Sequence, residues 1–315
     1  MKITVLDAAT LGADLDLSHL AALGELAIFS STTPEQLQER IADTDVIVIN
    51  KVKITREVLA RSTRLKMIAE CATGYDNIDL QACREKGIAV ANVVGYSTDS
   101  VAQLTLAMAL SLSTNLPAFT ACVADGSYTE GGVANRLTPV YHELAGKTWG
   151  VVGYGNIGGK VGAVAKALGC RVIAYARTPK EGVEMTDLQT LCRTADVISV
   201  HLPLTPETKG IIGAAEIAAM KPNAIFINVA RGAVTDEAAL ARAVSEGKLG
   251  GIGIDVYSTE PFPERHPFYA IRHLSNVCLT PHMAWGAFEA RARCLAEVGE
   301  NIAAFARGER RCRVD

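Results

Sequence analysis

The chain has 315 residues, of which 49% are hydrophobic and 21% are charged, and its formal net charge is −3 at pH 7. That length favours two domains, and that composition is too apolar for a disordered protein. The weak net charge gives no reason to expect a nucleic acid or an acidic membrane surface as a partner. The N-terminal segment lacks the features of a signal peptide, and no run reaches the roughly 18 consecutive apolar residues of a membrane helix.

Eight cysteines occur in the chain, but no two form a Cys-x-x-Cys pair and no His stands near them at metal-ligand spacing. Several of these cysteines lie inside apolar runs, where the side chain behaves as a small hydrophobic group. We therefore expect reduced, structural thiols without a metal, in a cytoplasmic protein.

Short apolar runs alternate with helical patterns in the first part of the chain. The predicted strands are Ile3–Leu6, Val46–Ile49, Leu65–Ala69 and Ile88–Asn92. Helices are predicted at Pro34–Ile41 and Leu80–Lys86, with Thr33 and Asp79 as N-caps. This alternation indicates a parallel sheet covered by helices on both faces.

A long helix is predicted from Ser97 to Asn115, and it is apolar on most sides. Such a helix must be buried in a core or against a partner, and it would suit a connection between domains. A glycine-bearing loop is expected from Asp125 to Asn135.

A second alternating series begins at Lys147. It predicts six strands: Thr148–Val152, Arg171–Tyr175, Val197–Val200, Ala224–Asn228, Gly251–Asp255 and Val277–Leu279. A helix at Glu289–Phe305 follows the last strand and is expected to return to the first domain. The predicted domains are therefore residues 1–97 plus 287–315, which would bind substrate, and residues 98–286, which would bind a dinucleotide.

The segment Gly153-Tyr154-Gly155-Asn156-Ile157-Gly158 is a Gly-x-Gly-x-x-Gly motif that follows a predicted strand and opens a predicted helix. That context is the one required for dinucleotide binding. Gly153 would make the tight turn, Gly155 would let the pyrophosphate approach the backbone, and Gly158 would let helix and strand pack closely. The helix N-terminus would face the phosphates.

The residues after the second strand of this series bear on which cofactor binds. NAD enzymes usually carry an acidic residue there, about 20 residues after the first glycine, to bind the ribose 2′-hydroxyl. Ala176 stands at that position, and Arg177 and Thr178 follow it. A guanidinium group suits a 2′-phosphate, so we expect NADP to be preferred over NAD. The alternative is that Arg177 is a solvated surface residue and NAD binds.

Three later segments place polar residues where strands end: Arg231, then Asp255 with Glu260 in the loop after it, and His282. Reduction of a 2-oxo acid needs a cation for its carboxylate and a proton donor for its carbonyl oxygen. Arg231 could supply the first and His282 the second. Glu260, if paired with His282, would favour the imidazolium form. Each residue alone is more often structural, but the ordered set after the glycine motif indicates catalysis.

These segments resemble the D-isomer-specific 2-hydroxyacid dehydrogenases, and the likeness covers nearly the whole chain. The motifs that carry it are Val151–Gly158, His201-Leu202-Pro203-Leu204-Thr205, Asn228–Gly232, Asp255-Val256 through Glu260-Pro261, and Thr280-Pro281-His282. The resemblance implies an α/β fold of two doubly wound parallel-sheet domains, a flavodoxin-like substrate domain and a Rossmann-type cofactor domain, with a cleft between them. It also implies a homodimer formed with help from the long connecting helix.

The resemblance also implies roles for individual residues. Arg231 would anchor the substrate, His282 would be the acid/base and Glu260 its partner. The cofactor site would be lined by Asn156, Ile157, Leu202, Thr208, Val229, Ala230 and Asp255. The segment Cys71–Asp79 resembles the family's substrate loop, so Thr73 and Gly74 would offer backbone amides to the carboxylate. Tyr96 matches a position where some members place a Tyr in the substrate pocket.

Within the family, Pro139–Lys147 and His282–Trp285 are most similar to glycerate dehydrogenases, also called hydroxypyruvate reductases. Those usually keep the acidic residue that this chain lacks, whereas NADPH-linked glyoxylate/hydroxypyruvate reductases often have Arg near position 177. Hydroxypyruvate or glyoxylate, giving D-glycerate or glycolate, is therefore the expected substrate. D-lactate dehydrogenase is the alternative, and phosphoglycerate dehydrogenase is less expected because no long C-terminal domain follows. A nicotinamide-sensing corepressor is an alternative of another class, but the complete catalytic set favours an enzyme.

Overall fold

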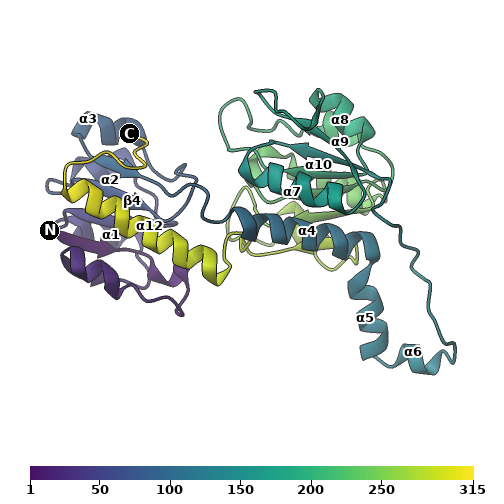
Figure 1. Ribbon diagram of the computed structural model, residues 1–315. Helices are drawn as coiled ribbons and strands as arrows, with labels where there is room; N and C mark the ends of the chain where they lie inside the picture. Colours follow the sequence, from purple (N-terminus) through teal and green to yellow (C-terminus); the bar gives the residue numbers. More distant parts are fainter. The chain divides into compact units, whose positions relative to one another are not determined.

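The computed structural model describes residues 1–315, and the chain divides into two compact units (Figure 1). The first unit comprises Met1–Ser97 and Gly286–Asp315, and the second comprises Thr98–Trp285. Residue 286 is the one position where these bounds differ from the expected domain bounds. The functional roles expected for the two domains stay predictions.

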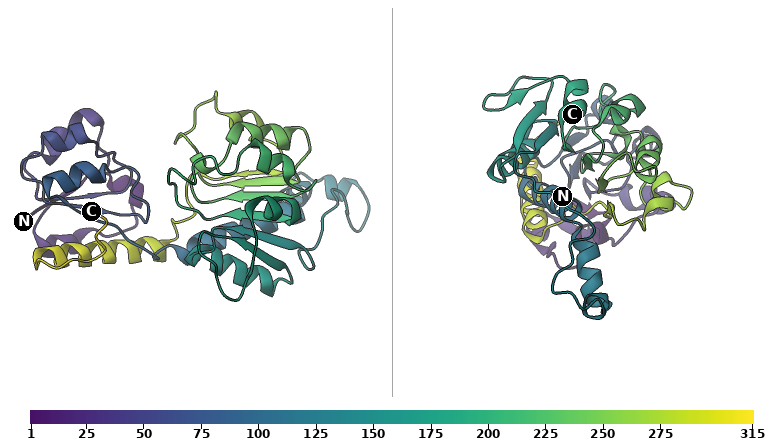
Figure 2. Two further views of the ribbon diagram at one scale, coloured as in Figure 1. Left: turned by 90° about the horizontal axis from the view of Figure 1, so that it is seen from above. Right: turned by 90° about the vertical axis from the view of Figure 1, so that its right-hand side faces the viewer.

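The first unit contains a five-stranded sheet in the order β2-β1-β3-β4-β5, with every neighbouring pair parallel. This is the flavodoxin-like order, as predicted. Its strands are β1 (Lys2–Val5), β2 (Glu25–Ile28), β3 (Val46–Ile49), β4 (Met67–Glu70) and β5 (Ala89–Ala91). One face packs against α1 (Pro34–Ile41), α2 (Arg56–Ala60) and α3 (Leu80–Lys86), and α12 (Phe288–Ala306) lies along the other (Figure 2).

Both predicted helix caps are confirmed in this unit. The Thr33 side chain accepts a hydrogen bond from the backbone N–H of Gln36, and the Gln36 side chain accepts one from Thr33 in return. The Asp79 carboxylate accepts a hydrogen bond from the Ala82 N–H at 2.8 Å. These contacts satisfy amide groups that have no partner within the helix, and so they fix where α1 and α3 begin.

The second unit contains a seven-stranded parallel sheet in the order β12-β11-β10-β9-β6-β7-β8. Chain order reverses between the neighbours β6 and β9, which is the switch point of a Rossmann-type fold, as predicted. The strands are β6 (Thr148–Val152), β7 (Arg171–Tyr175), β8 (Glu184–Met185), β9 (Val197–Val200), β10 (Ile225–Asn228), β11 (Gly251–Ile254) and β12 (Val277–Leu279).

Helices cover both faces of this sheet, and the strands are therefore apolar on both sides. Trp149 and Val151 of β6 pack with α4 (Thr98–Thr114) and α7 (Asn156–Ala167). Val152 points to the opposite core, as the alternation of side chains along a strand requires. That core includes residues of α8 (Leu188–Thr194), α9 (Ala214–Ala219), α10 (Glu237–Ser245) and α11 (Pro267–Ile271).

The sequence analysis missed β2 and β8, and both are edge strands. Glu25 and Ile28 of β2 are exposed, and β8 has only two residues, neither of them buried. An edge strand is half solvated, so neither segment shows the continuous apolar run that marks the buried central strands.

The predicted connecting helix is α4, and a second helix follows it after a single residue, which the sequence analysis did not predict. Asn115 takes a left-handed backbone conformation, and a separate helix, α5 (Leu116–Ala124), begins directly after it. Met108 and Ala109 are buried against the sheet, but Leu110 is 42% exposed. No single helix in the chain is long and apolar enough to cross a membrane; α4 and α5 meet that test only as a pair, with a 66° bend between them.

The chain after α4 forms an arm, defined here as residues 115–143, that stands away from the sheet of the second unit (Figure 1). The loop expected at Asp125–Asn135 contains one further helical turn, α6 (Ser127–Glu130). Many large apolar side chains of the arm are exposed: Leu116, Val123, Tyr128, Val133, Leu137, Val140 and Tyr141. An exposed apolar set of this kind is typical of a surface that binds a partner.

Candidate active site

The three motif glycines between β6 and α7 are required for different reasons. Gly153 has φ +96°, and a Cβ there would lie 2.8 Å from the carbonyl oxygen of His201. A Cβ on Gly158 would overlap the carbonyl oxygen of Gly153. A Cβ on Gly155, in contrast, would meet nothing within 4 Å. The first and third glycines are therefore needed by the fold, and the second leaves an open backbone face at the N-terminus of α7.

That open face fits the pyrophosphate of a dinucleotide. The helix behind it has 12 residues, and its first N–H groups and its dipole favour an anion. Gly155, Asn156, Ile157 and Gly158 occupy this position, as predicted for cofactor contacts. Their roles toward the cofactor stay predictions.

The turn is tied to the two strands beside β6. The Gly153 N–H donates to the Tyr175 carbonyl at 2.8 Å, and the His201 N–H donates to the Val152 carbonyl at 2.7 Å. Ala176 follows β7 and is partly buried, and Leu202 lies beside Gly153. Burial lowers the pKa of the His201 imidazole to about 3, so this side chain is neutral at physiological pH.

The predicted cofactor-selecting residues Arg177 and Thr178 are both exposed. A hydrogen bond from Thr205 and the positive charge of Arg177 lower the pKa of Glu207. The sequence analysis did not single out Glu207. Its carboxylate interacts electrostatically with the Arg177 guanidinium. The nearby Thr208 hydroxyl donates to the Pro203 carbonyl at 2.6 Å, so it shapes this loop.

The turn after β10 carries Arg231 and is held by Asn228. The Asn228 amide donates to the Arg231 carbonyl and accepts from the Ala230 N–H, both at 2.9 Å. Arg231 is partly buried, and its Nη1 donates to the Ala230 carbonyl at 2.8 Å. A Cβ on Gly232 would overlap the carbonyl carbon of Tyr257. The Arg231 turn therefore packs directly on the loop after β11, with Val229 buried behind it.

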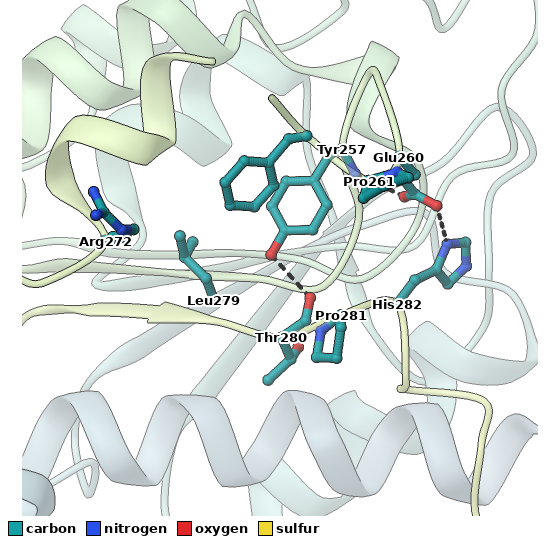
Figure 3. A pocket seen from close by; sticks show the side chains of 9 residues that line it. Tyr257, Glu260, Pro261, Arg272, Leu279, Thr280, Pro281 and His282 are labelled. Atoms are coloured by element: carbon teal, nitrogen blue, oxygen red, sulfur yellow. Dashed lines mark hydrogen bonds and ion pairs between the residues drawn. The ribbon is translucent and has the colours of Figure 1, made fainter. Parts of the chain in front are cut away.

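Glu260 and His282 meet as predicted. His282 Nδ1 lies 2.6 Å from Glu260 Oε2, and the Tyr257 N–H donates to Glu260 Oε1 at 2.9 Å (Figure 3). The Trp285 indole donates to the His282 carbonyl at 3.0 Å and supports that residue in its left-handed backbone conformation. Because Nδ1 is engaged by Glu260, Nε2 is the nitrogen through which His282 would exchange a proton with a ligand.

The Glu260–His282 pair lies at one end of a cavity of about 580 Å³ (Figure 3). The side chains of His282 and Glu260 are 21% and 32% exposed, so the pair is partly shielded from water and still accessible. The rest of the lining is mainly apolar and aromatic, with Tyr257, Phe262 and Leu279 among its members.

Asp255 holds the loop that carries His282. Its fully buried carboxylate accepts hydrogen bonds from the Thr280 hydroxyl at 2.6 Å and from the Met283 and Ala284 N–H groups at 2.8 Å. Burial raises the pKa of Asp255, and these hydrogen bonds act in the opposite direction. The sequence analysis predicted Asp255 to line the cofactor site. The structure shows that its oxygens hold the Thr280 side chain before His282 and the backbone after it, and its contact with a cofactor stays a prediction.

The predicted substrate residues of the first unit are Thr73, Gly74 and Tyr96. The Thr73 hydroxyl donates to the Val93 carbonyl at 2.8 Å, and the Asn92 side chain donates to the Thr73 carbonyl at 2.7 Å. These bonds fix the turn at Thr73 and Gly74. Tyr96 is only 6% exposed, and burial raises the pKa of its hydroxyl. The structure thus gives Tyr96 a packing role, and its contact with substrate stays a prediction.

Glu70 and Glu237 are buried acidic residues that the sequence analysis did not single out. Glu70 ends β4 and is fully buried; it accepts a hydrogen bond from Asn77 of the predicted substrate loop at 3.1 Å, and burial raises its pKa well above the usual range. The sequence offered one signal for this residue, because Glu70 is an acidic side chain at the end of an apolar strand. Glu237 lies 3.1 Å from the buried His266 beneath the Glu260 loop, and no local pattern marks that pair.

Comparison with known proteins identifies one family. Residues 106–284 match the family described as "D-isomer specific 2-hydroxyacid dehydrogenase, NAD binding domain". The chain is 35% identical over 317 residues to the hydroxypyruvate reductase of Blautia hydrogenotrophica, covering 98% of each protein. It is 41% identical over 298 residues to the D-3-phosphoglycerate dehydrogenase of Methanocaldococcus jannaschii; this match covers 92% of the chain but only 55% of that protein.

A solved structure is similar over almost the whole chain. The D-lactate dehydrogenase from Aquifex aeolicus, complexed with NAD and lactic acid, superposes with a TM-score of 0.88 at 29% identity. The superposition covers 98% of this chain and 96% of that one. Both units therefore have counterparts in an experimentally determined fold.

The glycine geometry leads to a prediction that separates cofactor binding from folding. Gly155→Ala should leave the thermal unfolding midpoint unchanged, because its Cβ meets open space. The same variant should weaken dinucleotide binding by at least about tenfold, because the methyl group occupies the face expected to receive the pyrophosphate. Binding is measured by quenching of tryptophan fluorescence.

Gly158→Ala is the matched comparison. Its Cβ overlaps the Gly153 carbonyl, so the protein itself should lose more than about 1 kcal/mol of stability. If Gly155→Ala bound the dinucleotide as tightly as the unmodified protein, the placement of the pyrophosphate would be wrong.

Proposed function

Since this chain belongs to the family of D-isomer specific 2-hydroxyacid dehydrogenases, we propose that it reduces hydroxypyruvate or glyoxylate to D-glycerate or glycolate. The family makes it an NAD(P)-dependent oxidoreductase. The observation that carries the proposal is the 2.6 Å contact between Glu260 and His282, beside the turn that carries Arg231. The choice of acid is supported by the similarity to a hydroxypyruvate reductase and by the segments Pro139–Lys147 and His282–Trp285.

The reaction assigns one task to each side chain of this set. Bound NAD(P)H supplies the hydride. The Arg231 guanidinium binds the substrate carboxylate through two parallel N–H donors. His282 Nε2 donates the proton to the oxygen that becomes the hydroxyl group, and Glu260 stabilises the imidazolium before that transfer. In the reverse direction His282 accepts the same proton. The turn at Thr73 and Gly74 in the first unit is proposed to offer amide donors to the carboxylate.

The proposal is tested by steady-state assays with hydroxypyruvate, glyoxylate and pyruvate against both reduced cofactors. We expect His282→Ala to lower turnover of the best acid by a factor of roughly 10², because the proton donor is lost. His273→Ala is the control, since that imidazole is exposed and does not line the cavity. Oxidation of D-3-phosphoglycerate is assayed in parallel.

Each result of these assays has a defined meaning. Highest activity with pyruvate would replace the proposed substrate by that of a D-lactate dehydrogenase. No turnover with any of these acids, together with tight cofactor binding, would favour the cofactor-sensing corepressor. Near-normal turnover in His282→Ala would contradict the acid/base role.

We further propose that NADPH is the preferred cofactor. Ala176 offers no carboxylate to the ribose 2′-hydroxyl, and the exposed Arg177 offers a guanidinium group to a 2′-phosphate. Arg177→Ala should raise the KM for NADPH by about tenfold and leave that for NADH nearly unchanged, because one charge-assisted hydrogen bond is lost. Arg193→Ala, an exposed arginine in the last turn of α8, is the control. A lower KM for NADH in the unmodified enzyme would refute this preference.

We also propose a homodimer that forms through the arm. The exposed apolar side chains of residues 115–143 would be covered by a second copy. Light scattering should therefore give twice the 33.4 kDa chain mass. The double variant Leu137→Asp/Val140→Asp should shift the mass to that of the monomer. Leu168→Asp, on the C-terminal end of α7, should not, and a monomeric unmodified protein would contradict the proposal.

The cysteines support a location in the cytoplasm, which we propose on that ground. All eight are unpaired, and six of them are buried. Thiols that serve as small apolar side chains persist in the reducing conditions of that compartment.

A further inference from the structure

We infer that Glu237 is a positioning residue for the catalytic pair. Together with Ser258 and His266 it forms what we call the Glu237 clamp, which holds the Tyr257–Glu260 loop so that Glu260 meets His282. The inference rests on the proposed function for its kinetic consequences, but its structural part is independent of the substrate.

Both carboxylate oxygens of Glu237 contact the other two residues of the clamp, Ser258 and His266. The side chain is 9% exposed and belongs to the first residue of α10. Oε1 accepts a hydrogen bond from the Ser258 N–H at 2.8 Å. Oε2 accepts one from the Ser258 hydroxyl and lies 3.1 Å from His266 Nε2. A buried carboxylate is held in place by such donors, and the N-terminus of α10 also favours its charge.

His266 donates to Glu237, because its other nitrogen is occupied as an acceptor. His266 caps α11, where Nδ1 accepts a hydrogen bond from the Phe268 N–H at 3.3 Å. The ring proton is therefore on Nε2, facing Glu237. Phe262 and Phe268 pack around the imidazole with ring centroids at 5.1 and 5.2 Å. These contacts leave the imidazole little freedom to move away from the carboxylate.

The clamp and the catalytic pair are joined through two successive amides. The Tyr257 N–H donates to Glu260 Oε1 at 2.9 Å, and the next N–H, that of Ser258, donates to Glu237. On its other side this peptide contacts Gly232, next to Arg231. A displacement of Ser258 would therefore move the carboxylate that orients His282, whereas the Arg231 turn keeps its separate anchor, Asn228. A misplacement on the order of 1 Å is enough to lower a reaction rate by a factor of about 10².

A second connection runs to His282 itself. The Tyr257 hydroxyl donates to the Thr280 carbonyl at 2.8 Å (Figure 3), and the His282 N–H donates to the same oxygen at 3.0 Å. The loop that the clamp holds is therefore hydrogen-bonded to the Glu260 side chain and to the carbonyl oxygen that also accepts from the His282 N–H.

Capping of α10 does not account for Glu237. The Asp236 side chain already caps this helix by accepting from the Ala239 N–H at 2.9 Å. The Glu237 oxygens are instead directed to the loop after β11 and to α11. That arrangement is what positioning requires, and a helix cap alone would not need it.

The test uses Glu237→Gln, which keeps the size of the side chain. The amide retains one oxygen for Ser258 but removes the charge and brings an NH₂ group against His266. We expect kcat to fall by roughly 10- to 100-fold, with KM for the oxo acid and Kd for the cofactor within about threefold. The control is Glu216→Gln, a first-turn glutamate of α9 that accepts from the Gly213 N–H at 3.0 Å. Its kcat should stay within about twofold of the unmodified enzyme.

A double variant distinguishes positioning from a general loss of stability. If Glu237 acts through Glu260, Glu237→Gln should lower kcat much less in a Glu260→Gln background than in the unmodified enzyme. If Glu237→Gln lowered kcat by the same factor in the Glu260→Gln background as in the unmodified enzyme, the inference would be overturned. Should Glu237→Gln fail to fold, Ser258→Ala removes one donor and keeps the charge, and it should show the same pattern with a smaller fall in kcat.

Amide hydrogen exchange tests the clamp without any substrate. Exchange in residues 257–262 should be at least about tenfold faster in Glu237→Gln than in Glu216→Gln, because the Ser258 N–H loses its charged acceptor. Equal exchange in the two variants would overturn the clamp. Absence of turnover in the unmodified protein would instead overturn the proposed function, so the two failures are distinguishable.

Discussion

The parallel direction of the strands in the second unit is the constraint on which its candidate site depends. Parallel strands end at the same edge of a sheet, so the segments that follow them are neighbours even when they are far apart in the chain. Gly153 follows β6, Arg231 follows β10, Asp255 follows β11 and His282 follows β12. The helices on both faces of the sheet pack against these strands.

Buried polar side chains hold the loops at this edge, in addition to apolar packing. Asn228 fixes the Arg231 turn, and Asp255 fixes the segment around His282. The first unit uses the same principle: the Asp7 carboxylate, which follows β1, accepts from the N–H groups of Asn50, Lys51 and Val52 after β3. A buried carboxylate left without these donors would be strongly unfavourable, so each anchor restricts its loop to a narrow range of conformations. Such restriction is what a catalytic geometry needs.

The sequence predicted the central strands and the glycine turn because their signals are local, whereas the pairing of Glu260 with His282 was expected from the family resemblance. A strand buried on both faces is a continuous apolar run, as in Val46–Ile49, and the glycine motif depends on spacing within one turn. Edge strands such as β2 lack that run, and the break at Asn115 depends on a single left-handed residue. Glu237, Ser258 and His266 could not be predicted, because their contact arises only when α10, the loop after β11 and α11 pack together. Single acidic or imidazole side chains in a sequence are usually solvated, so nothing local distinguishes these three.

The strand order also separates the choice of cofactor from the chemistry. Ala176 and Arg177 follow β7, on one side of β6, whereas Arg231, Asp255 and His282 follow β10, β11 and β12 on the other side. A dinucleotide bound across such a switch point has its pyrophosphate at the central turn and its two halves over opposite halves of the sheet. The residues that meet the adenosine ribose can therefore change without disturbing the Glu260–His282 pair. That separation allows position 176 to lack an acidic residue in a chain that keeps the Glu260–His282 contact.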